Sequence, residues 1–157
     1  MTKIKEGIKE KLTGLGIIAL IMLYLELALH VIIYRSIDAE IIFPLIFSLM
    51  AGIVIFVICA LVPRRFSSAA AIILVTLAVL FFETQYVYRC IFGGFMPLKQ
   101  IAMGAGAVTG FFSQMLHAIG QNILGIILIA LPLPLFIFLL AKKKLRSEEH
   151  TSELQSH

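Results

Sequence analysis

Four long runs of apolar residues, separated by short polar or charged segments, dominate the chain. They predict helices over 13–34, 41–62, 66–88 and 122–141. About 20 helical residues rise roughly 30 Å, which is the thickness of the hydrocarbon core of a bilayer. The pattern therefore predicts an all-α, polytopic membrane helical bundle with about four transmembrane helices, a transmembrane domain over 13–141.

Short local signals mark the ends of these helices. Pro44 falls in the first turn of the second helix, where its missing N–H costs little. Ser67 and Ser68 are expected to cap the start of the third helix. The segment 89–98 contains glycines and a proline, and we expect it to be a turn.

Residues 99–121 differ from the four apolar runs. They mix apolar side chains with glutamines, His117 and several glycines, and they are too polar for a clear membrane span. The segment is therefore expected to be interfacial or re-entrant helix. In the helix that follows, Pro132 and Pro134 predict a kink, which a membrane helix tolerates.

Basic residues orient the predicted helices, because cytoplasmic segments carry an excess of Lys and Arg. With a cytoplasmic N-terminus, the nine inside residues outnumber the three outside. The inside set is Lys3, Lys5, Lys9, Lys11, Arg64, Arg65, Lys142, Lys143 and Lys144, and the outside set is Arg35, Arg89 and Lys99. A fifth crossing at 99–121 would remove this bias, so four crossings are preferred.

The expected location is therefore a bacterial cell membrane, with the basic segments 1–12 and 142–145 in the cytoplasm. The N-terminal segment has no small-residue cleavage site before or after the first apolar run, so that helix is expected to be retained. Tyr34, Tyr86 and Tyr88 then fall at the outer interface, where amphipathic rings are favoured.

Composition supports the membrane prediction. The chain is 61% hydrophobic and 14% charged, whereas soluble domains carry about 25% charged residues. The net charge of +4 comes from clusters beside apolar runs, and no basic face with stacking aromatics points to nucleic acid. Cys59 and Cys90 are predicted at opposite ends of the bundle, too far apart for a disulfide.

A few ionisable residues interrupt the apolar runs. Glu26 and His30 stand four apart on one helical face, and Glu83 and Arg89 lie toward the outer end of the third helix. These four residues are candidates for a lipid-headgroup or proton site, because ionisable groups in a bilayer usually face a bundle interior or a water cavity. The alternative, which is favoured, is a purely structural role in which these residues form interhelical hydrogen bonds that stabilise the bundle. Ligands for a metal are too sparse to predict one.

No catalytic constellation is visible in the chain. Gly104, Gly106 and Gly110 do not complete a dinucleotide fingerprint, and Ser113 and His117 lack a recognisable hydrolase context. We therefore expect that this chain is not an enzyme by itself and carries no cofactor.

The last twelve residues, 146–157, read RSEEHTSELQSH. It looks like the in-frame translation of a common short-read sequencing adapter, whose complete codons give RSEEHTSELQS and whose trailing base starts the codon of the final His. The segment is expected to be non-native, like an expression scar. The natural reading frame is expected to continue past Leu145.

The stretch Leu80 to Val108, LFFETQYVYRCIFGGFMPLKQIAMGAGAV, resembles the lipoteichoic acid synthase family. The residues that carry the resemblance form an outer-interface turn motif. They are Tyr86, Val87, Tyr88, Arg89, Ile91, Phe92, Gly93, Phe95, Met96 and Leu98. The resemblance covers 80–108 closely and 1–145 loosely.

That resemblance implies five N-terminal transmembrane helices and an extracellular sulfatase-like domain, which transfers glycerol phosphate from phosphatidylglycerol with a Thr nucleophile and a divalent metal, usually manganese. The fifth helix, the nucleophile and the metal ligands have no counterparts in this sequence. The expectation is a truncated membrane-anchor domain of a phosphoglycerol transferase in cell wall biogenesis, which guides phosphatidylglycerol to a missing C-terminal domain. In this membrane-anchor domain, Arg89 would contact the phosphate of the lipid headgroup. The alternative is a self-contained small membrane protein, a transporter subunit or assembly factor with a polar intramembrane site.

Overall fold

The structure is a computed structural model that describes residues 2–97, 99 and 110–142. Within these ranges it contains helices and no strand, so the all-α prediction is confirmed. The elements are α1 (Thr2–Tyr34), the short 3₁₀ helix η1 (Ala39–Ile41), α2 (Ile42–Leu61), α3 (Arg64–Phe92), α6 (Phe112–Gln121) and α7 (Ile123–Ala130), followed by helix over 132–142.

Four of these helical stretches are long and apolar enough to cross a membrane. They are Thr13–Tyr34, Ala39–Leu61, Arg65–Phe92 and Ile123–Lys142. The bounds agree with the predicted helices to within about four residues. Many large apolar side chains on them stay exposed, Phe43 and Phe47 of α2 among them at 72% and 77%. This outward apolar surface is what a helix bathed in lipid presents.

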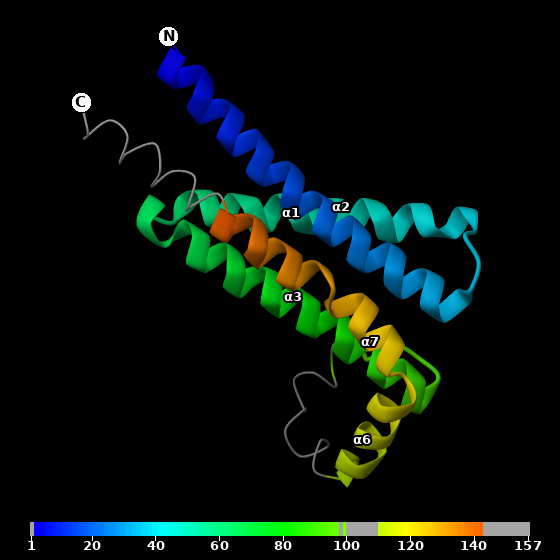
Figure 1. The fold of residues 1–157 in the computed structure, drawn as a ribbon. Helices are drawn as coiled ribbons and strands as arrows, with labels where there is room; N and C mark the ends of the chain where they lie inside the picture. Colours follow the sequence, from blue (N-terminus) through cyan, green and yellow to red (C-terminus); the bar gives the residue numbers. More distant parts are fainter. Residues whose placement is uncertain (1, 98, 100–109, 143–157) are drawn as a thin grey trace.

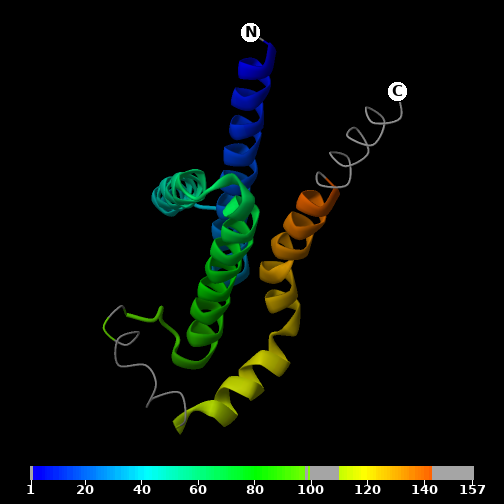
Figure 2. The same cartoon turned by 90° about the vertical axis from the view of Figure 1, so that its left-hand side faces the viewer.

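The bundle has two distinct ends (Figure 1). At one, α1 ends at Tyr34, α2 begins and α3 ends; we call this the Tyr34 end. At the other, the Pro63 end, α2 turns into α3, and the helix that ends at Lys142 also finishes there. Figure 2 shows α1 and α3 side by side and α7 returning at an incline to them, whereas α2 is seen nearly end-on and therefore crosses them.

The third helix is longer than predicted, because residues 89–92 are helical and not part of the turn. It ends at Gly93, whose backbone has φ 73° and whose N–H donates to the Arg89 carbonyl. A glycine in this left-handed conformation is the commonest way to end a helix. The extra turn keeps Arg89 on the helix surface.

The start of α3 also differs from the prediction. Pro63 is the N-cap residue, and neither Ser67 nor Ser68 caps the helix with its side chain. Ser67 Oγ instead donates a hydrogen bond of 3.0 Å to the carbonyl of Cys59 in the last turn of α2. It thereby satisfies one of the carbonyls that a helix C-terminus leaves unpaired.

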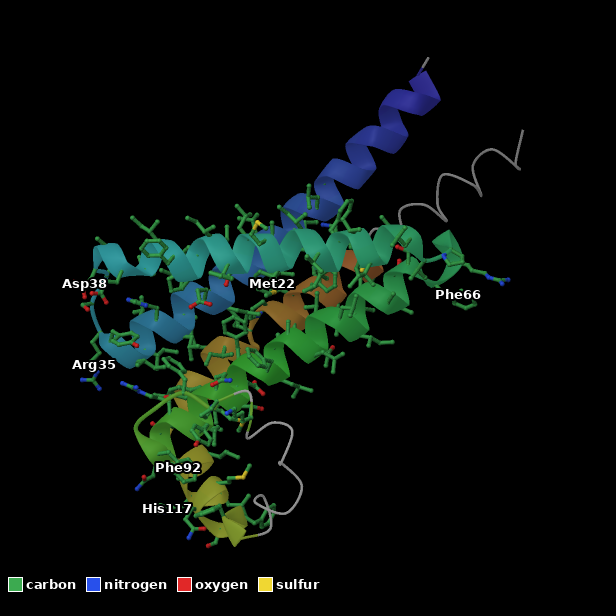
Figure 3. All side chains as sticks on the ribbon, turned by 180° about the vertical axis from the view of Figure 1, so that it is seen from behind. Met22, Arg35, Asp38, Phe66, Phe92 and His117 are labelled. Atoms are coloured by element: carbon green, nitrogen blue, oxygen red, sulfur yellow. The ribbon has the colours of Figure 1, made fainter. Side chains whose placement is uncertain are left out.

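The core lies where α1, α2, α3 and α7 meet. Leu25, Val75, Val79 and Ile129 are fully buried there, and Met22 sits midway along the bundle (Figure 3). Helices α1 and α2 approach each other closely at Gly52, where an added Cβ would lie 3.0 Å from the Ala19 Cα. Small residues permit such close backbone contact in membrane bundles.

Where Pro132 and Pro134 predict a kink, the last helix is interrupted at Leu131, between α7 and the helix over 132–142. Pro132 has no N–H, so the Leu128 carbonyl, four residues earlier, loses its helical donor. The hydroxyl of Tyr24 from α1 donates to that carbonyl at 3.0 Å. A side chain distant in sequence therefore supplies the hydrogen bond that the proline removes.

Candidate functional site

Polar and ionisable side chains gather around a cavity at the Tyr34 end. Its volume is about 170 Å³. The lining residues come from α1, the connection to α2, the start of α2 and the segment after α3; they are Glu26, Leu29, His30, Tyr34, Asp38, Glu40, Pro44 and Phe95. Glu26 and Tyr34 are eight residues apart on α1, so the cavity extends roughly 12 Å along that helix.

Glu26 is the lining residue of α1 furthest along the helix from Tyr34, and it is hydrogen-bonded to α2. Ser48 Oγ, on a residue only 4% exposed, donates a hydrogen bond of 2.9 Å to Glu26 Oε2. The bond joins α1 to α2 and is the interhelical type that favours a structural role. The other carboxylate oxygen of Glu26 has no hydrogen-bond partner within the described ranges.

His30 lies one turn further along the same face of α1. Its ring packs against Tyr34, with centroids 4.7 Å apart. Its Nε2 atom is buried and has no hydrogen-bond partner among the residues that the structure describes. A buried polar nitrogen without a partner is costly, so this edge of the ring is available to a bound group.

Arg89 stands beside the cavity and not inside it. Its guanidinium lies over the ring of Tyr34 at 5.8 Å and over the ring of Phe95 at 5.5 Å. Both rings also line the cavity. Cation–π contacts of this kind hold a guanidinium in place without neutralising it.

Glu83 does not join this group. It is not among the residues that line the cavity, and no ion pair with Arg89 occurs in the described part of the chain. The two residues are six positions apart on α3, about 240° around the helix, so they point in different directions. Of the four candidate residues, Glu26 and His30 line the cavity, Arg89 lies over two of its aromatic rings, and Glu83 has no such connection to it in the described ranges.

The turn motif is distributed over two environments. Tyr88 packs on Phe92, with centroids 4.5 Å apart, and Phe92 meets Phe111 edge-on at 5.3 Å. Gly93 ends α3, and Phe95 then reaches the cavity. The motif thus brings the end of α3 to both the segment before α6 and the cavity.

Tyr86, which the topology predicts at the outer interface, lies inside the bundle between α3 and α7. It is 6% exposed, and its hydroxyl is 3.4 Å from Asn122 Oδ1. A Cβ added at Gly125 would lie 2.6 Å from the Tyr86 Cζ. The ring therefore occupies the space that the missing Gly125 side chain leaves between α3 and α7.

Helix α6 extends from the Tyr34 end at an angle to α7 (Figure 2). Ser113 and His117 lie on it and are exposed, and Figure 3 places His117 far from the core around Met22. The glycines at 104 and 106 lie outside the described residues. In the described part of the chain, no cluster of three or more His, Cys, Asp or Glu residues is arranged to hold a metal ion.

Sequence reasoning missed three polar residues of the site: Ser48, Asp38 and Glu40. Ser48 carries the single hydroxyl within the apolar run of α2. A lone hydroxyl in an apolar run indicates a hydrogen bond to another helix, so the sequence could have identified this residue. Asp38 and Glu40 follow α1 in the connection, and Asp38 Oδ2 accepts a hydrogen bond of 2.6 Å from Ser36 Oγ. Only the return of α2 along α1 places these acids beside Glu26.

Comparison of the chain with family models, with curated proteins and with solved structures finds no match. The functional argument therefore depends on the cavity and its surroundings.

Proposed function

We propose that this chain is the membrane-anchor part of a phosphoglycerol transferase similar to lipoteichoic acid synthase, and that its Tyr34 end faces the outside of a bacterial cell. In this role the four helices fix the protein in the membrane. The cavity end holds a phospholipid headgroup near a catalytic domain that follows in the natural protein. The turn motif around Arg89 and the distribution of basic residues support the proposal.

The observation that carries the headgroup role is the state of Arg89. Its guanidinium is positioned by two aromatic rings and has no carboxylate partner in the described ranges. It lies at the Tyr34 end, within a turn of the end of α3. A guanidinium without a carboxylate partner beside the cavity is suited to bind a phosphate in a bidentate manner.

Replacement of this residue tests the headgroup role. The full chain is purified in detergent with phosphatidylglycerol, and bound lipid is counted by native mass spectrometry. Arg89→Gln should lower retention about tenfold, because a charge-assisted hydrogen bond is lost. Arg35→Gln is the matched control, since Arg35 is an exposed arginine at the same end with no aromatic partner among the residues that the structure describes (Figure 3). Equal retention by both variants would contradict the role.

The orientation has its own test. Single cysteines are introduced as Ser113→Cys in α6 or Ser68→Cys at the Pro63 end, with Cys59 and Cys90 both replaced by serine. Both serines are exposed. A membrane-impermeant maleimide should label position 113 in intact cells and position 68 only after lysis. The opposite result would reverse the proposed topology.

The transferase assignment is tested at the source locus. Sequencing beyond codon 145 should show a fifth apolar helix and then a sulfatase-like domain. A stop codon directly after this position, or a soluble domain without a fifth helix, would end the assignment and leave the self-contained small membrane protein.

A further inference from the structure

The cavity at the Tyr34 end carries a chemistry that the anchor role does not use. Three of its lining residues are acids, Glu26, Asp38 and Glu40, and none is a lysine or arginine. No ion pair neutralises these acids in the described part of the chain. Glu26 lies within the membrane-spanning part of α1, where an uncompensated carboxylate is costly.

The hydrogen bonds around the acids leave acceptors free. Ser48 satisfies Glu26 Oε2, and Ser36 satisfies Asp38 Oδ2. These two bonds engage one oxygen of each carboxylate. The buried Nε2 of His30 has no hydrogen-bond partner within the described ranges. The cavity therefore presents carboxylate oxygens, and its lining includes no lysine or arginine.

The remaining walls are aromatic or apolar. Tyr34 and Phe95 contribute ring faces, and Leu29 and Pro44 contribute apolar surface. Acceptors combined with ring faces are what ammonium groups seek, because they form charge-assisted hydrogen bonds and cation–π contacts. A bare metal ion fits poorly, since the described residues provide no cluster of ligands for one.

We propose that this cavity binds an ammonium group, with Glu26, Asp38 and Glu40 as its acceptors. Arg89 lies over the rings of Tyr34 and Phe95, at the edge of the same site. It is placed to take the phosphate that follows the ammonium in a zwitterionic phospholipid headgroup. This inference is independent of the transferase assignment, because it depends on the acids and not on any missing domain.

The test uses the full chain in detergent, with equal amounts of phosphatidylethanolamine and phosphatidylglycerol and native mass spectrometry as the readout. Phosphatidylethanolamine should be retained about tenfold more, as expected when one charge-assisted contact is gained. Glu26→Gln and the double variant Asp38→Asn, Glu40→Gln should each remove most of this preference. Glu10→Gln, in the part of α1 far from the cavity, is the matched acidic control and should keep it.

Two competitors identify the source of the ammonium. Free ethanolamine that displaces the lipid, where glycerol at the same concentration does not, shows that the ammonium alone is recognised and that a soluble amine is a sufficient ligand. No displacement by either, with the variant effects intact, assigns the site to the lipid headgroup. Both results support an ammonium site.

Equal retention of the two lipids by the wild-type chain would overturn the inference. So would an unchanged preference for phosphatidylethanolamine in both Glu26→Gln and the double variant Asp38→Asn, Glu40→Gln. The double variant changes only exposed residues in the connection between α1 and α2, so the test remains decisive even if Glu26→Gln unfolds. If the wild-type chain shows no preference for phosphatidylethanolamine but still requires Arg89 to retain phosphatidylglycerol, the ammonium site is refuted and the proposed function stands.

Discussion

The hydrogen bond from Tyr24 to the Leu128 carbonyl gives the sharpest test of how this bundle is held together. Pro132 cannot donate to that carbonyl, and the hydroxyl of Tyr24 does so at 3.0 Å across 104 positions of the chain. Tyr24→Phe keeps the ring and removes only the hydroxyl. It leaves a backbone acceptor without a partner in an environment where lipid offers no donor.

The expected loss follows from this geometry. Interhelical hydrogen bonds in membrane proteins average ~0.6 kcal/mol and reach ~1.7 kcal/mol, whereas an unsatisfied acceptor away from water costs about 1–3 kcal/mol. Because the proline leaves no alternative donor, we expect Tyr24→Phe to lower the free energy of unfolding by about 1.5 kcal/mol.

The second arm of the experiment restores the missing donor. Pro132→Ala returns an N–H to the helix, so Leu128 can accept a bond from within its own chain segment. In that background Tyr24→Phe should cost less than about 0.5 kcal/mol, and the double-mutant cycle should yield a coupling of about 1 kcal/mol. Tyr34→Phe is the matched control for stability, since the structure gives its hydroxyl no hydrogen bond within the described ranges.

The assay uses a cysteine already present. Cys59 is 4% exposed in the core, and Cys90 is exposed. In a Cys90→Ser background, pulse labelling of Cys59 with a thiol reagent reports the unfolded fraction along a titration of SDS into mild detergent. A coupling near zero, with Tyr24→Phe equally costly in both backgrounds, would refute the idea that Tyr24 replaces the donor lost at Pro132.

Three further variants test close contacts with the same assay. Gly52→Val should destabilise the bundle by about 1–3 kcal/mol relative to Gly16→Val, because a side chain at Gly52 meets the Ala19 backbone whereas Gly16 has open space around it; equal effects would mean that the α1–α2 contact adjusts freely. Gly93→Ala should cost about 1–2 kcal/mol, since a Cβ is strained at φ 73°; an unchanged midpoint would show that α3 ends differently. Ser67→Ala should cost about 0.5–1.5 kcal/mol through the lost bond to α2, and no loss would indicate that water reaches that carbonyl.

The predicted site was only partly recoverable from sequence. Glu26 and His30 were found because charge and imidazole stand out within an apolar run, and their spacing of four places them on one helical face. Glu83 was grouped with them only because it lies in the outer half of its helix. Its position six residues before Arg89 makes the two side chains point in different directions from α3. The topology predicts Tyr86 at the outer interface, and only the tertiary structure shows that its ring fills the space beside Gly125 inside the bundle.

The sequence by itself determined the all-α class and the four long apolar helices, because length and hydropathy are local properties that a bilayer selects directly. It also marked the break at Pro132, since a missing N–H acts within one helical turn. The tertiary structure decided which face of each helix is buried. In lipid both faces of a helix are apolar, so no periodic pattern in the sequence distinguishes the inward face. Phe47 and Val75 are both apolar, yet Phe47 is exposed and Val75 is fully buried. The cavity, the Ser48–Glu26 bond and the Tyr24 donor all arise from how α1 packs against its neighbours, and that packing depends on shape at a few small residues such as Gly52.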